Sequence, residues 1–484
     1  MANVEQLEDV NHQETFRQPK QLQHLRSSIV AKPPYCQGTL ALPQKDFTLF
    51  YGTEGDAQRI NLSRASAAQL QHLADTCAPA SFGVGGEDIY DETYRKAGKL
   101  DCEDFAITFD ASRSCLADVI RNELLVENPK KVKSEDLNIE LYKLNVYGKD
   151  AFFKAHVDTP RSELMFGSLV IVFPTPHEGG ALKLRASGHE EGENPEWTFD
   201  SSALLAQQEQ PSIAYVAFFS DVEHEVMPVT SGHRVTITYN LFYVPAESEP
   251  PEELTSISTN EQSFKNALQA ALEDQSFLPT GGNLMFGLKH QYPLATYYCE
   301  PYNPRDEAAR EKKTQAMEAR AKRALHALEP RLKASDRVIF KVLRECALDT
   351  SLKILHEASD GDNPEAVEGY VMADGVLPMP TTRYGIGMYA SEYVAEQGGQ
   401  LVEDAVVLME KQAKWGQSVG YHLEDHGAPV YWVDHPRLRS GKGFKAKFAT
   451  YGNESALGVV YWSVWIFVRI GPAGQREMAQ VSEE

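Results

Sequence analysis

Short apolar runs separated by turn-rich segments fill the middle of the chain, between residues 138 and 243. The runs are rich in β-branched and aromatic residues, which favour strands, and the segments between them contain Gly, Pro, Asn and Asp. Such a succession of short strands is typical of a jelly roll, in which two antiparallel sheets face each other. The predicted strands are 138–147, 152–157, 167–174, 181–185, 196–199, 212–219, 223–227 and 233–243.

The segment before this core predicts its supporting elements. Residues 29–62 combine short apolar runs with turn signals, which indicates strands and a hairpin at a sheet edge. Apolar residues at helical spacing predict helices over Ser63–Thr76, with a serine as N-cap, and over Ser112–Glu127. Residues 80–97 contain several glycines but no phosphate-loop lysine, so we expect an ordinary loop there.

The second half of the chain follows a segment rich in Pro, Glu and Ser at 245–262, which predicts a linker. Helical patterns cover Ser263–Glu273, the highly charged Arg305–Ala334, and Asp336–Glu357. The end of the chain returns to aromatic and β-branched runs that are typical of strands. These runs are 384–390, 404–410, 429–434, 447–453 and 459–470.

Together these elements predict an α+β chain that is mainly β. Residues 1–27 are polar and poor in aromatics, which is typical of a disordered tail. Residues 28–244 form the predicted jelly roll with supporting helices, and 245–262 form the linker. Residues 263–484 form a C-terminal α+β domain, for which two interpretations stay open: a degenerate second jelly roll or a substrate-docking domain.

The composition limits the partners and the location that we expect. The chain has 484 residues, of which 42% are hydrophobic, enough for the cores of two or three domains. Its 47 Lys and Arg against 69 Asp and Glu give a net charge of 47 − 69 = −22, which disfavours nucleic acid and anionic membranes as partners. No run approaches the roughly 18 apolar residues of a membrane-spanning helix, and the polar N-terminus lacks a secretory or transit signal. We expect a cytoplasmic or nuclear protein.

Three residues of the predicted core have the side chains of a metal site. His156 and Asp158 lie at positions i and i+2, and the period of two in a strand points both to the same face. His224, much later in the chain, supplies a third ligand. Two histidines and one carboxylate, with the other coordination positions open, form the facial arrangement of non-haem Fe(II) sites that bind an organic acid and O2.

Arg234 follows in a strand-like run, and a guanidinium holds a carboxylate through two charge-assisted hydrogen bonds. Alternation along the strand points Thr236 to the same face as Arg234, and points His233 to the opposite face. His177 and His189 lie in turn-rich segments, so these three histidines are the weaker candidates for the third metal ligand. The pattern predicts an anion site beside the metal.

Further motifs surround these candidates and carry a family resemblance. They are His156-Val157-Asp158, its lead-in of Tyr147-Gly148 and Phe153, Gly179-Gly180 after the next strand, and His224-Glu225-Val226 before Pro228. Together they resemble the Fe(II)/2-oxoglutarate-dependent dioxygenases, and within these the prolyl 4-hydroxylase-like branch. The close resemblance covers the predicted core alone. More loosely, the whole chain resembles a set of fungal oxygenase-like proteins.

This resemblance implies a cupin-like double-stranded β-helix that binds Fe(II) through the two histidines and the aspartate. It also implies 2-oxoglutarate and O2 as co-substrates, with ascorbate as an additional reductant. Arg234 would hold the C5 carboxylate of 2-oxoglutarate, with Thr236 and Tyr147 as helpers. Several members have a tyrosine on the strand before Gly-Gly that assists in this, and Val172 stands there instead, so more of the binding falls to Arg234.

For the substrate, the resemblance implies hydroxylation of an unactivated C–H bond with release of succinate and CO2. The first expectation is a prolyl or other side chain of a protein or peptide. A small metabolite is the alternative substrate. A catalytically silent scaffold with a vestigial iron site is the alternative without activity, and the intact set of ligands disfavours it.

Overall fold

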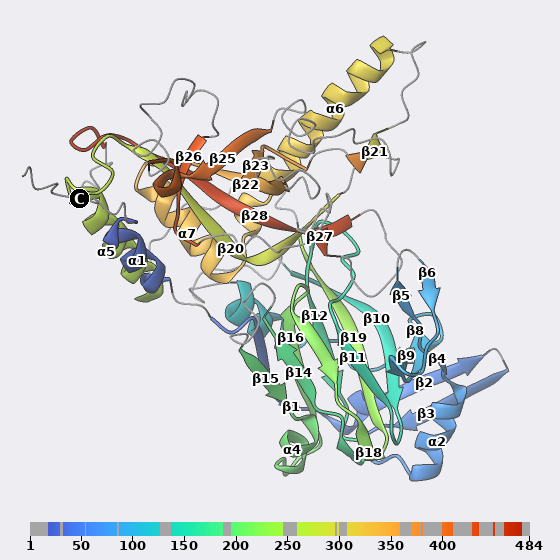
Figure 1. Cartoon of the computed structure of the whole chain (residues 1–484). Helices are drawn as coiled ribbons and strands as arrows, with labels where there is room; N and C mark the ends of the chain where they lie inside the picture. The colour runs from blue at the N-terminus through green and yellow to red at the C-terminus, as the bar shows by residue number, and fades with distance from the viewer. Residues whose placement is uncertain are drawn as a thin grey trace, which may run out of the picture.

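The computed structural model has two β-rich halves, which occupy the lower (blue to green) and upper (yellow to red) parts of the view in Figure 1. No helix in the ranges that the structure describes is both long and apolar enough to cross a membrane. The described residues are 18–29, 32–53, 55–84, 87–125, 137–186, 195–244, 259–295, 298–299, 307–358, 369–376, 379–380, 399–409, 428–434, 449–450 and 459–476.

The N-terminal half contains a seven-stranded sheet in which all neighbouring strands are antiparallel. The strand Ser212–Phe219 is buried at every position, as its continuous apolar sequence SIAYVAFF requires. The strand order is β1 (Tyr35–Ala41), β16 (Ser212–Phe219), β12 (Met165–Val172), β19 (Arg234–Tyr243), β10 (Leu137–Tyr147), β8 (Gly98–Asp101) and β4 (Ala78–Pro79).

A five-stranded antiparallel sheet forms the second layer of this half. Leu169 and Ile171 of β12 belong to the same buried cluster as Leu182 and Leu184 of the second sheet, so the two sheets enclose one core. This arrangement is consistent with a double-stranded β-helix. The strand order is β15 (Glu196–Phe199), β14 (Leu182–Arg185), β17 (Glu223–Val226), β11 (Phe152–His156) and β7 (Arg95–Lys96).

The predicted core strands are present at or close to their predicted bounds, but several very short elements escaped prediction. Residues 80–97, expected as a loop, contain three short strands, one of which belongs to the second sheet. Elements of two to six residues show at most a weak hydrophobic period. The unpredicted elements include β4, β5 (Phe82–Val84), β6 (Glu87–Ile89), β7, β8, β13 (His177–Gly179), β18 (Val229–Gly232) and helix α4 (Ser201–Ala206).

The supporting elements precede this core in the sequence. Helix α2 (Ala67–Thr76) begins at Ser66, which forms a reciprocal capping box with Gln69. The helix predicted over Ser112–Glu127 is shorter than expected: α3 spans Leu116–Ile120 and continues into one π-helical turn, η2 (Arg121–Leu125). The remaining supports are the short 3-10 helix η1 (Gln44–Phe47) and a small sheet of β3 (Asp56–Asn61), β2 (Thr48–Thr53) and β9 (Phe105–Ile107).

The prediction of a disordered segment over residues 1–27 is wrong for its last part. Lys20–Ser28 forms helix α1, which lies beside α5 (Thr259–Glu273) of the other half in Figure 1. Its Leu22 and Leu25 are buried in the hydrophobic core of the C-terminal half. Two leucines three residues apart in a polar segment are a weak helical signal, so the packing against α5 decides the structure here.

The C-terminal half is built on a closed ring of six strands. β20 pairs with both β26 and β28, which closes the ring, and β26 runs parallel to both of its neighbours. Within the described residues, this closed ring with parallel pairs differs from the two facing antiparallel sheets of a jelly roll. The ring contains β20 (Gly282–Ala295), β26 (Ala428–Trp432), β25 (Gln400–Asp404), β23 (Gly369–Ala373), β22 (Asp349–Ala358) and β28 (Val459–Ile470); β27 (Ala449–Thr450) extends it, and β21 (Tyr298–Cys299) pairs with β24 (Met379–Pro380).

Among the described residues, the helices of this half include α5, α6 (Glu307–His326), the short η3 (Glu329–Arg331) and α7 (Ala334–Glu345). The helix predicted over Asp336–Glu357 is wrong after Glu345, because Ala347 takes a left-handed φ of 55° and the following residues pair with β28 as β22. Residues 405–409 are helical, although a strand was predicted over 404–410. The strand predicted at 384–390 and most of the expected linker lie outside the described residues, while 259–262 of that linker belong to α5.

Candidate functional site: a two-histidine, one-carboxylate metal centre

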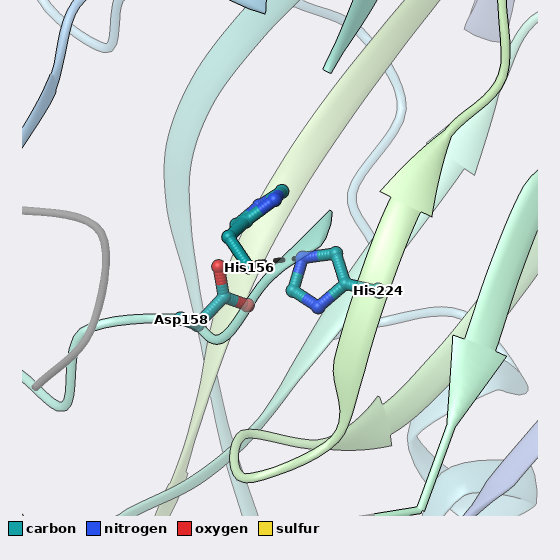
Figure 2. Close-up of side chains that lie close together, drawn as sticks. All are labelled: His156, Asp158 and His224. Atoms are coloured by element: carbon teal, nitrogen blue, oxygen red, sulfur yellow. Dashed lines mark ion pairs between the residues drawn. The ribbon is translucent and has the colours of Figure 1, made fainter. Parts of the chain in front are cut away.

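Two neighbouring strands of the second sheet bring the predicted metal ligands together. β11 ends at His156, which stands opposite His224 of β17 in the antiparallel register. Asp158 follows β11 directly, and its Oδ1 lies 3.7 Å from Nε2 of His224. One ligand atom from each residue lies within 4.8 Å of the other two, and Figure 2 shows the three side chains gathered at one point. Histidines opposite each other on paired strands and a carboxylate just beyond form one facial set of ligands.

Backbone carbonyl groups fix the ring orientation of both histidines. Nδ1 of His156 lies 2.7 Å from the carbonyl oxygen of Lys154, and Nδ1 of His224 lies 3.0 Å from that of Val222. A carbonyl oxygen only accepts hydrogen bonds, so the proton of each neutral ring must be on Nδ1. The lone pair of each Nε2 is then available for a metal ion.

Asp158 has a different environment from the two buried histidines. Its side chain is 23% exposed, and its Oδ2 accepts a hydrogen bond of 2.6 Å from the hydroxyl group of Ser168 on β12. Oδ1, which faces His224, is the oxygen on the ligand side. One hydrogen-bonded oxygen and one directed at the metal position give the orientation that a monodentate carboxylate ligand needs.

Burial keeps His156 in the form that binds metals. Desolvation, and then the neighbouring His224, lower the pKa of His156 well below its usual value, with a smaller contribution from Arg95. The ring stacks on Phe153 with 3.6 Å between ring centroids and an interplanar angle of 21°. A neutral and immobilised imidazole is the species that coordinates Fe(II).

The anion site beside these ligands is built around Arg234, the first residue of β19. Its side chain is among the largest that are fully buried, and its Nε and Nη2 have no hydrogen-bond partner in the described part of the chain. Burial lowers the pKa of Arg234 to about 10, while the nearby Tyr147 acts in the opposite direction. A buried guanidinium with unpartnered N–H groups is costly unless an anion completes it, so Arg234 has the environment that a carboxylate-binding residue needs.

The two predicted helpers of Arg234 lie on the same sheet face. Tyr147 of β10 is paired directly with Arg234, whose Cζ lies 5.5 Å from the centroid of the tyrosine ring. Thr236 stands two residues further along β19, opposite Asn145, and Val172 of β12 is its other neighbour. Tyr147, Arg234 and Thr236 all line the cavity that contains the metal ligands, and their role in binding 2-oxoglutarate stays a prediction.

Comparison of the sequence with models of known protein families identifies the domain that contains the three ligands. Residues 142–242 match the family model of the 2OG-Fe(II) oxygenase superfamily, and the three ligands lie within this segment. The chain carries a 2OG-Fe(II) oxygenase domain. The oxygenase domain is an enzyme domain with a complete facial triad of His156, Asp158 and His224, and the family together with the triad implies Fe(II) and 2-oxoglutarate as its cofactor and co-substrate.

Solved structures give only distant similarities, and no curated protein matches the chain. A prolyl 4-hydroxylase from Pseudomonas putida is 19% identical, with 46% of this chain and 99% of that chain covered and a TM-score of 0.25. A 2OG-Fe(II) oxygenase family oxidoreductase from Burkholderia pseudomallei is 15% identical, with 46% and 89% covered and a TM-score of 0.21. A prolyl 4-hydroxylase from Phytophthora capsici is 12% identical, with 53% and 77% covered and a TM-score of 0.22.

The residues of the oxygenase domain fit both implied groups. The two Nε2 atoms and Oδ1 of Asp158 form a set of nitrogen and oxygen donors suited to Fe(II). The unpartnered guanidinium of Arg234 lies in the same cavity and suits the carboxylate of a dicarboxylic acid. Of the competing histidines, His177 is not among the residues that line this cavity, and its Nδ1 bonds the carbonyl of Thr175 at the start of β13. His189 is outside the described residues.

Sequence reasoning missed a second buried guanidinium in this cavity. Arg95 of β7 donates to Oδ1 of Asn145 at 3.0 Å, and its Cζ lies 4.3 Å from the ring centroid of Phe153. The Phe153 ring therefore packs between Arg95 and His156. Arg95 comes from the segment expected as a loop, and no spacing relates it to the ligands. Only the pairing of β7 with β11 brings it there.

A third group of cavity residues combines cations with an aromatic ring. Lys143 Nζ and Arg161 Cζ lie 4.0 Å and 4.3 Å from the ring centroid of Tyr142, and Arg161 donates to the Tyr142 hydroxyl at 2.6 Å. The pairing of β10 with β19 shifts register between Leu141 and Lys143, which is a bulge at Tyr142. A bulge changes the direction of side chains along its strand, so the consecutive residues Tyr142 and Lys143 both line the cavity, which the sequence alone did not indicate.

Proposed function

We propose that the oxygenase domain hydroxylates an unactivated C–H bond of a protein or peptide side chain, with proline as the first substrate to test. The observation that carries the oxygenase chemistry is the convergence of His156, Asp158 and His224 with the unpartnered Arg234 in one cavity. The preference for a prolyl substrate rests on the motifs around the ligands, above all the lead-in from Tyr147 to His156.

Each side chain of the cavity has a role in this proposal. His156 and His224 hold the metal through Nε2, since their Nδ1–H groups are occupied by backbone carbonyls. Asp158 supplies the negative ligand, and Ser168 fixes its orientation. Arg234 binds the C5 carboxylate of 2-oxoglutarate, which sets the direction in which the oxo acid end of the co-substrate reaches the metal position.

The buried walls of the cavity exclude water from the reacting groups. Tyr147 covers the Arg234 guanidinium, and Phe153 covers one face of His156. When bound, Fe(II) with 2-oxoglutarate and O2 supplies an oxidation in which one oxygen atom enters the substrate C–H bond and the other enters succinate, with loss of CO2. Ascorbate, as an external reductant, would keep the metal in the ferrous state.

The test is a substrate screen with two readouts. The protein is incubated with Fe(II), ascorbate, 2-oxoglutarate and a peptide library in which each proline-containing peptide has a proline-to-alanine partner. We expect succinate release and a peptide mass increase of one oxygen atom for some proline peptides and not for their partners. Succinate formation with no dependence on any peptide would contradict the proposal.

A panel of small metabolites in the same assay tests the alternative substrate class. Oxygen incorporation into a metabolite, with no peptide modified, would assign the domain to small-molecule oxidation. Binding of 2-oxoglutarate is measured separately through the metal-dependent rise in melting temperature. Retention of neither metal nor 2-oxoglutarate would identify the domain as a scaffold.

A further inference from the structure

A pair of fully buried opposite charges joins the two halves of the molecule close to the metal site. Asp221 lies in the turn between β16 and β17, three residues before His224, and Lys333 precedes α7 in the C-terminal half. Lys333 Nζ lies 2.7 Å from Asp221 Oδ1, and the two side chains are 1% and 2% exposed. A charge pair removed so completely from water requires further hydrogen bonds to be stable.

A bulge in β20 supplies these further bonds. The pairing of β20 with β28 shifts register between Gly287 and Gln291. From this bulge, His290 Nδ1 and the backbone N–H of Gln291 lie 3.2 Å and 3.0 Å from Asp221 Oδ2. Burial by itself raises the pKa of Asp221, but Lys333 and His290 outweigh it and hold the pKa well below its usual range. The carboxylate is therefore ionised and bonded through both oxygens.

The bulge itself is held by a second buried carboxylate. Asp336 of α7 accepts hydrogen bonds from the backbone N–H groups of Lys289 and His290 at 2.8 Å and 3.0 Å, and from the Tyr292 hydroxyl at 2.9 Å. The same hydroxyl group accepts from the backbone N–H of Lys333 at 3.0 Å. Asp336 and Tyr292 thus fix Lys333 and the bulge relative to each other through contacts that do not involve Asp221.

The turn that contains Asp221 leads directly to a metal ligand. Val222, the next residue, provides the carbonyl oxygen that binds Nδ1 of His224 and sets the orientation of its ring. A shift of the Asp221 turn therefore moves the acceptor that fixes the ligand. Groups that orient a metal ligand in this way tune metal affinity although they never contact the metal.

The segment after Asp158 has contacts with the same half. Glu163 accepts a hydrogen bond of 3.0 Å from the backbone N–H of Ala295, the last residue of β20. At the end of β19, the Tyr243 hydroxyl donates to the carbonyl of Arg331 at 3.0 Å. The segment before His224 and the segment after Asp158 thus both contact the C-terminal half.

We propose that the C-terminal half is a structural part of the metal centre, in which Lys333 is a positioning residue that holds the Asp221 turn and thereby orients His224. This structural role of the C-terminal half is separate from the substrate docking that the sequence left open. It does not depend on which substrate the domain oxidises. Its first test is metal affinity, which is measured without turnover.

The variants are chosen so that misfolding does not decide the result. Lys333→Met leaves Asp221 buried without the Lys333 ammonium, so the double variant Asp221→Asn/Lys333→Met, in which neither charge of the pair remains, is measured beside it. Lys341→Met is the matched control, because Lys341 is also on the α7 segment but pairs with Glu261 and Glu345 inside the C-terminal half. Mn2+ binding in the presence of 2-oxoglutarate is measured by titration.

We expect the double variant to fold and to bind Mn2+ about 10-fold to 100-fold more weakly, the usual effect of losing a group that orients a ligand. The control should bind like the natural chain. At saturating metal the double variant should regain most of its kcat, because only ligand placement is disturbed. A folded double variant with unchanged metal affinity would overturn the proposal.

The natural chain offers a measurement that no folding defect affects. Coupling between two sites is reciprocal, so metal binding should slow hydrogen exchange at the backbone N–H of Gln291, which bonds Asp221. The backbone N–H groups of β23, on the far side of the ring, serve as the reference. Equal exchange at Gln291 with and without metal would refute the coupling, whatever the variants show.

Discussion

At the residue scale, the site depends on the protonation state of its ionisable side chains. Burial, and then the neighbouring His224, disfavour the imidazolium form of His156, and backbone carbonyls bind Nδ1 of both His156 and His224. Arg234 keeps its charge in spite of complete burial, since even a pKa of about 10 leaves it protonated at neutral pH. The cavity thus presents two lone pairs, one carboxylate and one unpartnered cation.

Asp158→Ala should abolish turnover, because it removes the negative ligand from the facial set. The variant should still fold, since the side chain is 23% exposed and the Ser168 hydroxyl, which donates to it, loses one acceptor. Succinate release and Mn2+ titration measure the two effects. Ser168→Ala is the control and should weaken metal binding only partly. Turnover by Asp158→Ala would rule out the assigned ligand set.

Arg234→Met should separate co-substrate binding from stability. The affinity for 2-oxoglutarate should fall roughly 100-fold or more, because each charge-assisted hydrogen bond contributes about 1.5–3 kcal/mol. The free energy of unfolding without ligands should rise by about 1–3 kcal/mol, because buried N–H groups without partners are removed. Kinetics at varied 2-oxoglutarate and urea unfolding test this. A variant with an unchanged KM for 2-oxoglutarate would place the carboxylate elsewhere.

The stability of the metal-free protein should fall in mild acid. Burial lowers the pKa of His156 and His177 in the folded state, while in the unfolded chain both have ordinary values of about 6.5. Below about pH 6.5 the unfolded chain therefore takes up protons that the folded protein refuses, and stability decreases by up to about 1.4 kcal/mol per pH unit for each such proton. Urea unfolding in EDTA from pH 7.5 to pH 5 should show this slope, and His156→Gln should reduce it. A flat profile would count against neutral buried histidines.

At the element scale, the Gly-Gly turn has a defined role in shaping the anion site. Gly179 and Gly180 precede β14 and have φ values of 74° and 71°, in the left-handed region that glycine adopts most easily. A Cβ atom on Gly180 would lie 2.7 Å from Cδ of Arg234 and 2.9 Å from Cγ2 of Val229. The backbone of this turn therefore packs directly on the arginine side chain and fixes its direction.

Gly180→Ala should raise the KM for 2-oxoglutarate by displacing Arg234, and it should cost about 1–3 kcal/mol of stability from backbone strain. Gly55→Ala is the matched control. Gly55 has a φ of 88°, but nothing lies within 4 Å of the added Cβ. The control should lose stability without a change in KM. Equal KM values for both variants would show that the turn has no influence on the anion site.

At the scale of the whole molecule, the two halves are joined by buried charges as well as by packing. Asp221 and Lys333 are separated by 112 residues in the sequence, and neither is accessible to water in the folded protein. Helix α1 adds a second connection, because it precedes the oxygenase domain in the sequence and packs in the C-terminal core. The halves should therefore unfold together.

Lys333→Met should lower the free energy of unfolding by about 3–5 kcal/mol, the usual cost of removing one partner of a buried pair. Asp221→Asn/Lys333→Met should recover most of this loss, because no uncompensated charge remains. Urea unfolding followed by circular dichroism gives both values, and a single transition is expected for the natural chain. Equal losses for the single and double variants would show that the pair is not the source of the stability.

Much of the oxygenase domain was predictable because its signals are local. The strands of the core are long enough to show apolar runs, and the spacing of His156 and Asp158 already places both side chains on one face. Arg234 and Thr236 follow the same period of two. The metal and anion sites were therefore recognisable from short stretches of sequence.

Other features were not predictable, because they depend on neighbours far away in the chain. The β-branched and charged residues after Glu345 read as a continuing helix, but pairing with β28 makes them the strand β22. Leu22 and Leu25 gave too weak a pattern to distinguish α1 from a disordered tail. In each of these segments tertiary contacts outweigh a weak local preference.

The sequence by itself determined the facial triad, the order of the core strands along the chain and the arginine proposed to bind the co-substrate, since these follow from side-chain chemistry and the geometry of a single strand. Only the tertiary structure decided what surrounds them. It placed Arg95 behind Phe153, closed the C-terminal strands into a ring and brought Lys333 to Asp221. The physical reason is that burial and charge pairing depend on distance in space, which the order of residues along the chain does not record.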